Sequence, residues 1–377
     1  MKAVTFQGIN EVQVQNTPDP RILKPDDIII QVTSTGICGS DLHFYHGMIP
    51  SMGKGYILGH ETMGVVLETG PDVHKVKRGD RVAIPFNVAC GHCRFCEAEL
   101  ESQCDLANPE GEMGAVYGCS RLFGDYAGGQ AELLRVPYAN YLPMVIPPGC
   151  EVEEDTLLLM TDALPTSLWG VIQSGMKQGD TVVVLGCGPI GLLTQKWAWR
   201  LGASRVIAVD YVPYRLEHAR KANRVETVNF LEQPRTGEYL REITNGGADV
   251  VIDCVGGDGK MSFIEKVETA LRLQGGGMSA INIASQAVRK GGTVELVGFY
   301  GLRYNAFPLG DFFGRSVSLR MGTASVVHLM GRIYEELSSG FDPSDIITHR
   351  LPLSSAAHAY EIFDKKKEDA VKIILKP

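Results

Sequence analysis

The chain has 377 residues, of which 44% are hydrophobic and 21% are charged, and this ordinary globular mixture excludes a disordered or fibrous protein. A net charge of −8 and the lack of a polybasic block argue against nucleic acid or an anionic membrane as a partner. The length predicts two domains, and no apolar run approaches the roughly 20 residues that cross a bilayer. Because the start lacks the features of a signal peptide, we expect a cytoplasmic protein.

The first part of the chain is predicted to be β-rich. Short β-branched runs are interrupted by Gly, Pro and Asp, which is typical of strands separated by turns. Three such runs lie at 27–36, 64–70 and 80–85.

Two short motifs in this region carry candidate metal ligands. GICGSDLH (36–43) contains Cys38 and GHETMG (59–64) contains His60. A catalytic zinc needs three protein ligands and one open position, and a thiolate and an imidazole are suitable for two of the three. Taken alone, the pair is weak evidence, because a buried cysteine is usually part of a core.

The nine cysteines are unevenly distributed, and their odd number in a chain without an export signal does not indicate a disulfide framework. Cys90, Cys93, Cys96 and Cys104 lie close together in one segment. Four thiolates can surround one tetrahedral Zn²⁺ and leave no open position, so the segment predicts a structural zinc site. An iron–sulfur cluster is less favoured because the spacing differs from the usual ferredoxin run, and ordinary buried cysteines are the other alternative.

The second half of the chain changes to alternating strands and helices. TVVVLGCGPIGLLTQKWAWRLGASRVIAVD (181–210) is predicted to form a buried strand, a glycine turn, a helix and a second buried strand. Repetition of this pattern up to about 305 indicates a doubly wound α/β domain. The stretch 257–290 is longer than one crossover needs; it is interpreted as a surface excursion, with an interface or a cofactor cover as the alternative. Residues 306–377 are too few for an independent core, so we expect them to return to the first domain.

The glycine turn has the context that a dinucleotide site requires. Gly186, Gly188 and Gly191 form G-x-G-x-x-G between a strand and a helix, whose N-terminus faces the pyrophosphate. Asp210, at the end of the next strand, can accept hydrogen bonds from the adenosine ribose and repels a 2′-phosphate. Tyr211 follows it rather than a basic residue, which further favours NAD over NADP. The alternative role for Asp210 is a helix N-cap.

These motifs occur in the order found in zinc-dependent medium-chain alcohol dehydrogenases, which the chain resembles over nearly its whole length. The resemblance is carried by GICGSDLHFYHG, LGHETMG, the four-cysteine segment, and VVLGCGPIG followed by Asp210. It implies an α/β fold with a β-rich GroES-like catalytic domain (1–160 and 306–377). A Rossmann NAD-binding domain with a doubly wound parallel sheet (161–305) interrupts that domain.

The resemblance also implies the contents of the metal site. Cys38 and His60 hold a catalytic zinc, and Asp162, in MTDALPTSLWG (160–170), is the third ligand by similarity. With the four-cysteine site, this gives two Zn²⁺ per subunit. Glu61, next to a ligand, either orients the site or occasionally enters the coordination sphere.

Further roles are implied by the same family. Ser40 takes the substrate proton, and the cofactor ribose and His43 carry it onward. Asp41 and His46 are interpreted as structural, with lining of the cleft as the alternative. Besides the glycine motif and Asp210, the residues assigned to the cofactor are Gly39, Thr166, Pro189, Ile190, Arg215, Cys254, Val255 and Val297.

A subfamily is indicated by GDYAGGQAELLRVPYAN (124–140), by Asp at the third ligand position and by the extended stretch 257–290. These features resemble the glutathione-independent formaldehyde dehydrogenase branch, and imply hydride transfer between NAD and a small-molecule primary alcohol or hydrated aldehyde. A polyol or threonine dehydrogenase, and an aldehyde dismutase with tightly bound NAD, are the alternatives. A zinc-ribbon nucleic-acid module is disfavoured by the negative charge. The family also implies a homo-oligomer, with a tetramer favoured over a dimer.

Overall fold

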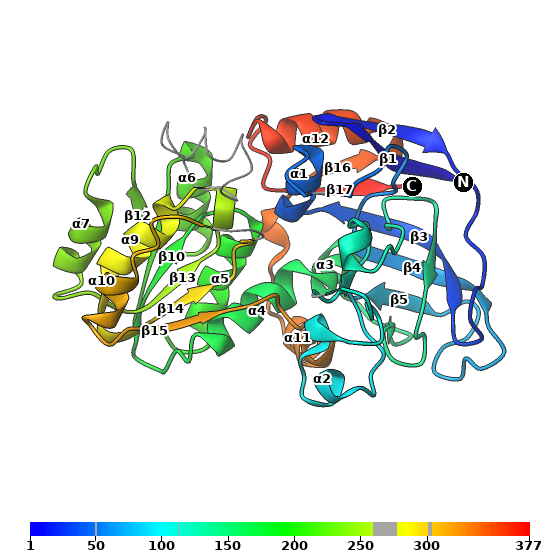
Figure 1. Cartoon of the computed structure of the whole chain (residues 1–377), viewed down its shortest axis with the longest axis horizontal. Coiled ribbons are helices and arrows are strands. Elements are labelled where there is room, and N and C mark those ends of the chain that lie inside the picture. Colours follow the sequence, from blue (N-terminus) through cyan, green and yellow to red (C-terminus); the bar gives the residue numbers. More distant parts are fainter. Residues whose placement is uncertain (50, 112, 259–276, 301–303) are drawn as a thin grey trace. The chain divides into compact units, whose positions relative to one another are not determined.

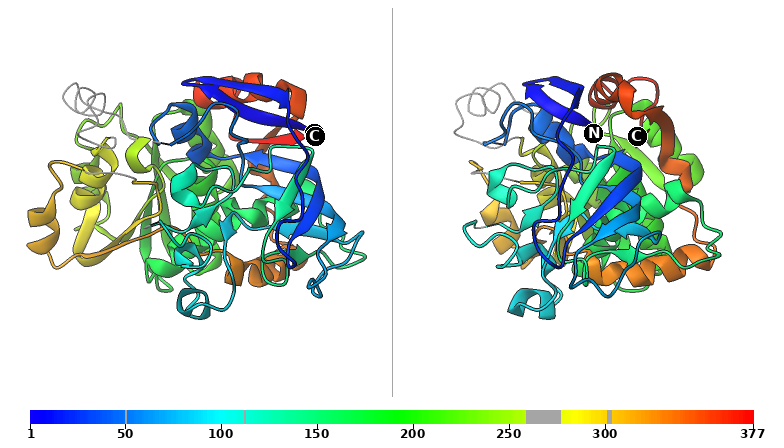
Figure 2. Two further views of the ribbon diagram at one scale, coloured as in Figure 1. Left: turned by 45° about the vertical axis from the view of Figure 1, so that its right-hand side comes forward. Right: turned by 90° about the vertical axis from the view of Figure 1, so that its right-hand side faces the viewer.

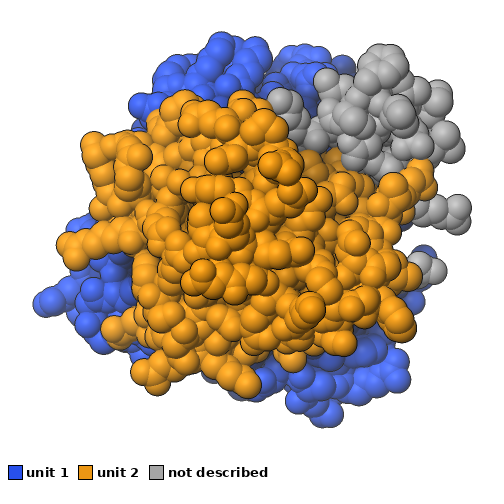
Figure 3. Space-filling model, turned by 90° about the vertical axis from the view of Figure 1, so that its left-hand side faces the viewer, with its two compact units in different colours: residues 1–165, 325–377 blue, residues 166–324 orange. Residues whose placement is uncertain are grey.

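The structure is a computed structural model that describes residues 1–49, 51–111, 113–258, 277–300 and 304–377. The chain divides into two compact units, coloured separately in Figure 3. Unit 1 comprises Met1–Pro165 and Ser325–Pro377, and unit 2 comprises Thr166–Ala324. Both chain ends lie in unit 1, side by side (Figure 2).

Unit 1 is built on a seven-stranded sheet with the order β16-β17-β3-β4-β5-β9, and β8 pairs with β3. The strands are β3 (Ile28–Ile37), β4 (Thr62–Thr69), β5 (Arg81–Ile84), β8 (Leu133–Val136), β9 (Met144–Val145), β16 (Ile347–Pro352) and β17 (Lys372–Lys376). Two smaller sheets pair β1 (Lys2–Gly8) with β2 (Glu11–Asn16), and β6 (Asn87–Val88) with β7 (Ala115–Val116). The helices are α1 (Gly39–Tyr45), α2 (Arg94–Glu97), α3 (Glu154–Leu158), α11 (Met330–Ser338) and α12 (Ala356–Asp364) (Figure 1).

The strand register of this sheet gathers distant parts of the sequence at one end. β3 is buried along most of its length because its β-branched residues pack into the core, and it runs directly into α1. β4 pairs with it antiparallel, with Thr35 opposite Thr62, and β17 pairs on the other side, with Ile37 opposite Ile373. The residues just after β3, just before β4 and at the start of β17 therefore meet.

Unit 2 contains a six-stranded, fully parallel sheet with the order β12-β11-β10-β13-β14-β15. The strands are β10 (Thr181–Leu185), β11 (Arg205–Asp210), β12 (Glu226–Asn229), β13 (Ala248–Asp253), β14 (Val288–Leu296) and β15 (Ser318–Met321). The helices are α4 (Ala163–Gln173), which begins in unit 1, α5 (Pro189–Arg200), α6 (Pro213–Ala222), α7 (Thr236–Ile243), α9 (Ser279–Ala287) and α10 (Leu309–Phe313). Residues of α7 and α9 pack with one face of the sheet in a single apolar core, and the fully parallel strand order agrees with the predicted Rossmann-like α/β class.

The second boundary between the units differs from the expected position at 305/306. β15 pairs in parallel with β14 and extends the sheet of unit 2 by one strand, so the chain returns to unit 1 only at Ser325. Of the extended stretch 257–290, residues 259–276 lie outside the described part, and α9 forms most of the remainder. In the described ranges, no helix is both long and apolar enough to cross a bilayer.

Candidate active site

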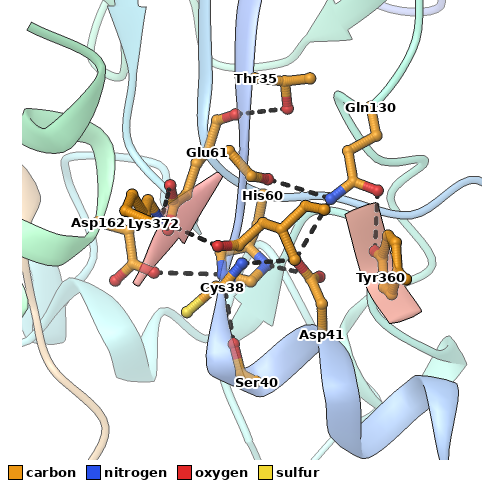
Figure 4. A network of polar contacts seen from close by, with 12 residues as sticks. Thr35, Cys38, Ser40, Asp41, His60, Glu61, Gln130, Asp162, Tyr360 and Lys372 are labelled. Atoms are coloured by element: carbon orange, nitrogen blue, oxygen red, sulfur yellow. Dashed lines mark hydrogen bonds and ion pairs between the residues drawn. The ribbon is translucent and has the colours of Figure 1, made fainter. Parts of the chain in front are cut away.

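The metal site predicted in unit 1 lies where β3, β4 and the segment before α4 converge. Cys38 is the N-cap of α1, and His60 and Glu61 directly precede β4. Asp162 follows the 3-10 turn Leu159–Thr161. One ligand atom of each of these four residues lies within 4.8 Å of the others (Figure 4). The structure thus brings together the three predicted ligands and the carboxylate of Glu61, which the sequence also placed at this site.

The imidazole of His60 is almost fully buried and lies between two carboxylates. Its Nδ1 is 3.4 Å from Asp41 Oδ1, and its Nε2 is 3.2 Å from Asp162 Oδ2. Neither His60 Nδ1 nor Asp41 Oδ1 has a hydrogen-bond partner among the described residues. A carboxylate at one ring nitrogen favours the tautomer that leaves the other nitrogen to bind a metal, so this donor set fits a zinc ion.

Asp41 is itself held in place from two directions. Its Oδ2 accepts hydrogen bonds from the backbone N–H of Cys38 (3.0 Å) and from Gln130 Nε2 (3.3 Å). Gln130 also donates to the carbonyl of Gly36, and its Oε1 accepts from the hydroxyl of Tyr360. The sequence predicts a structural or cleft-lining role for Asp41 and includes Gln130 only in the subfamily motif, so neither of these contacts was predicted. The available signal was the position of Asp41 at N3 of a helix capped by a metal ligand.

The pKa values describe a site built for a cation. Burial raises the pKa of the Cys38 thiol, and the Asp162 carboxylate raises it further. Burial alone would lower the pKa of His60, but the charge of Asp41 and the hydrogen bond to Asp162 raise it well above its usual range. A bound divalent ion stabilises the thiolate and displaces the imidazole proton, so metal binding is coupled to proton release.

The two predicted relay residues both lie on α1. Ser40 Oγ is 3.3 Å from His60 Nε2, at the ligand cluster. His43 is buried, with 6% exposure, and follows Ser40 by three positions, so the two side chains share one side of the helix. His46 instead pairs with Asp364 of α12 at 2.9 Å, in keeping with its structural interpretation.

The four cysteines of the second predicted site surround a single point. Cys93 Sγ is 3.6 Å from Cys96 Sγ and 3.8 Å from Cys104 Sγ, and Cys90 Sγ is 3.9 Å from Cys96 Sγ. Tetrahedral zinc with Zn–S bonds of about 2.3 Å requires sulfur–sulfur distances of about 3.8 Å. Although burial opposes it, hydrogen bonding from the Cys96 backbone lowers the pKa of Cys93 to about 6. The cluster therefore fits a closed, structural zinc ion.

The glycine turn of unit 2 is shaped for close approach. Gly186 has a φ of +93°, which favours glycine, and a Cβ at Gly191 would overlap the carbonyl of Gly186. Gly188 is the N-cap of α5, and Pro189 and Ile190 form its first turn. Among the described residues, the only atom near a Cβ at Gly188 would be Arg215 Nη1. The Nε atom of Arg215 is buried and has no hydrogen-bond partner in the described part of the chain. An open glycine beside a guanidinium fits a pyrophosphate at a helix N-terminus.

Asp210 ties this turn to the end of β11. Its Oδ2 accepts from the N–H of Cys187 (2.7 Å), and its Oδ1 accepts from the N–H groups of Tyr211 and Val212. The N-cap of α6 is Val212, so Asp210 does not occupy the alternative N-cap position.

The other residues assigned to the cofactor belong to unit 2, except for Gly39, which belongs to unit 1. A Cβ at Gly186 would contact Val255 and the carbonyl of Cys254, and a Cβ at Gly170 of α4 would contact Val297. Thr166 lies on α4 and is the first residue of unit 2. Gly39 belongs to unit 1, at the start of α1.

Comparisons with known proteins agree with a zinc site in unit 1 and a dinucleotide-binding sheet in unit 2. The family model of the alcohol dehydrogenase GroES-like domain matches residues 24–147, and that of zinc-binding dehydrogenases matches residues 189–273. The uncharacterized zinc-type alcohol dehydrogenase-like protein AdhB of Bacillus subtilis is 58% identical over 378 residues, which cover 100% of both chains. A glutathione-independent formaldehyde dehydrogenase of Pseudomonas aeruginosa is 40% identical over 263 residues, covering 68% of this chain and 65% of that protein.

Among solved structures, alcohol dehydrogenase TADH from Thermus sp. ATN1 is 35% identical with a TM-score of 0.84. The match covers 100% of this chain and 99% of that one. These matches confirm the predicted combination of a GroES-like domain and a Rossmann-like parallel sheet.

Proposed function

Since this chain belongs to the family of zinc-type medium-chain alcohol dehydrogenases, we propose that it transfers a hydride between NAD and a primary alcohol or hydrated aldehyde such as formaldehyde. The observation that carries this proposal is the convergence of Cys38, His60 and Asp162 on one point. A thiolate, an imidazole and a carboxylate fill three positions of a zinc ion and leave a fourth for substrate.

When bound there, zinc supplies a Lewis acid that polarises the substrate oxygen and lowers the pKa of the alcohol. The residues of the chain orient the site and move the proton. Asp41 holds the ring of His60 so that Nε2 faces the ligand cluster. Ser40 takes the proton that the alcohol loses, and His43, on the same side of α1, carries it onward.

The choice of NAD over NADP rests on Asp210. Its two oxygens together accept three backbone hydrogen bonds, which fix the carboxylate at the end of β11 and leave about one acceptor site, on Oδ2, for a ribose hydroxyl. Its negative charge repels a 2′-phosphate.

The formaldehyde-like substrate class is supported by the partial match to formaldehyde dehydrogenases and by Asp at the third ligand position. Gln130 gives the subfamily motif GGQAE a physical role, because it anchors the carboxylate that faces His60. A polyol or threonine dehydrogenase and a dismutase remain as the competing outcomes of the assay below.

We further propose two zinc ions per subunit, a cytoplasmic location, and a homo-oligomer in which a tetramer is favoured over a dimer. A reducing compartment is supported by the nine cysteines, all of which are free thiols in the structure.

The test is a screen for NADH formation with formaldehyde, short primary alcohols, polyols and threonine, run in parallel with NADP and with measurement of bound metal. We expect NADH with formaldehyde and short primary alcohols, and two zinc ions per subunit. Turnover confined to polyols or threonine would overturn the substrate class. Turnover without added NAD, with dinucleotide recovered after denaturation, would identify a dismutase. No turnover and a single zinc per subunit would overturn the proposed function.

A further inference from the structure

Four ligand-bearing side chains converge at the catalytic site, although a catalytic zinc uses only three. The carboxylate of Glu61 belongs to the same 4.8 Å cluster as the ligand atoms of Cys38, His60 and Asp162. Zinc with four protein ligands is a closed, structural site, whereas catalysis needs an open position. A restraint on Glu61 therefore decides which kind of site forms.

Lys372 supplies such a restraint from the far end of the sequence. It is the first residue of β17, whose pairing with β3 places it beside Ile37 and the ligand cluster. Its side chain is 1% exposed, and its ammonium group forms an ion pair with Glu61 and donates to the Ile37 carbonyl at 3.1 Å. Figure 4 shows Lys372 and Glu61 next to each other at the edge of the cluster.

Apart from Asp41, which lies behind His60, the charges of the ligand cluster and of Lys372 balance in two separate groups. A zinc ion with the Cys38 thiolate, neutral His60 and the Asp162 carboxylate has no net charge. The ion pair of Glu61 and Lys372 is also neutral. Loss of the ammonium group leaves Glu61, which is 0% exposed, as an unpaired buried carboxylate, and such a group is costly unless it takes up a proton or pairs with another cation.

The packing around Glu61 restricts where its carboxylate can meet a cation other than Lys372. A Cβ at Gly36 would overlap its carboxylate, so the group packs directly against the backbone of β3 on that side. The other place for a cation that its carboxylate borders is the one that Cys38, His60 and Asp162 would provide for a metal ion.

We propose that Lys372 is a positioning residue that holds Glu61 away from the catalytic metal and thereby keeps the fourth coordination position open to substrate. This inference rests on the proposed zinc-dependent function. Loss of an ordinary structural residue weakens metal binding, whereas loss of Lys372 is expected to strengthen it. Without Lys372 the metal is held more tightly and the site is closed.

The test compares Lys372→Met with Lys372→Arg, the double variant Lys372→Met/Glu61→Gln, and a matched control, Lys376→Met. Lys376 lies on the same strand but pairs with Asp155 and is 39% exposed. Each protein is prepared with zinc, for release to a chelator, and with cobalt, for visible absorption with and without imidazole as a small external ligand. The four-cysteine site offers imidazole no open position, so a response reports the catalytic site.

For Lys372→Met we expect loss of the imidazole response, slower release of the catalytic metal, and a fall of about 10- to 100-fold in kcat/KM, the usual effect of altering a partner of a metal ligand. Lys372→Arg and the double variant should regain the imidazole response, and Lys376→Met should behave as the unaltered protein. If Lys372→Met does not fold, Lys372→Gln makes the same test, because it keeps a donor to Glu61 without the charge.

The role of Lys372 would be overturned if Lys372→Met, or Lys372→Gln in its place, responded to imidazole as the unaltered protein does. Faster release of the metal from that variant would also overturn it. So would a double variant that stays closed. If the unaltered protein itself binds only one zinc or its cobalt form ignores imidazole, the proposed function fails instead.

Discussion

Glu295 is a buried carboxylate in the parallel sheet of unit 2, on the strand next to the edge strand β15. It lies on β14, opposite Ile252 of β13 and Arg320 of β15, and is 0% exposed. Neither carboxylate oxygen has a hydrogen-bond partner in the part of the chain that the structure describes. Burial raises its pKa from 4.5 to about 7, against a smaller opposing effect of Arg320.

The sign of the effect on stability follows from proton binding. Between pH 4.5 and about 7 the folded state holds the Glu295 proton more tightly than the unfolded state does, so the free energy of unfolding falls as pH rises through this window. At 1.36 kcal/mol per pH unit, the full loss is about 3 kcal/mol. Replacement by Gln, which does not titrate, removes this dependence.

We therefore expect the difference in stability between Glu295→Gln and the unaltered protein to change by about 3 kcal/mol in favour of the variant between pH 4.5 and pH 8. This difference in stability is measured by urea unfolding monitored by tryptophan fluorescence. The signal reports the unfolding of unit 2, because all three tryptophans, Trp169, Trp197 and Trp199, belong to it. Glu242→Gln, an exposed site on α7, is the control. Parallel stability–pH curves for Glu295→Gln and the unaltered protein would refute the reasoning.

Three further predictions concern the metal and cofactor sites. Cys38→Ser should abolish turnover and reduce bound zinc from two ions per subunit to one, and near-native turnover in zinc-free buffer would contradict a catalytic metal. His43→Gln should slow the reaction most at low pH, where little solvent base is present to take the proton; an unchanged pH–rate profile would remove His43 from the relay. Asp210→Ala should raise the KM for NAD by about 10-fold or more, from loss of charged hydrogen bonds, and reduce discrimination against NADP. A KM ratio for the two cofactors equal to that of the unaltered protein would exclude Asp210 as the selecting residue.

The parts of the site that sequence predicted best are those whose residues are local. The four cysteines share one short segment, so their spacing alone indicates zinc, and the glycine turn is recognisable because its strand and helix adjoin it. Asp162 is about one hundred residues from His60, and only resemblance to a family pointed to it.

Lys372 could not be found from the sequence, because its role depends on which strand β17 joins. The pairing of Ile373 with Ile37 is a long-range choice that no local pattern encodes. The same limitation affects the second domain boundary, since a four-residue strand such as β15 gives no periodic signal of the sheet that it extends.

The path of the chain through the two units also sets an order of events during synthesis. Cys38, His60, Glu61 and Asp162 all precede unit 2, whereas Lys372 follows it. At about 5–20 residues per second, the ribosome needs on the order of 10–40 s to make the intervening chain. For that interval β3 lacks its neighbour β17, and the ligand set is present without its ammonium counter-charge. The open form of the metal site is therefore among the last features that the nascent chain can acquire.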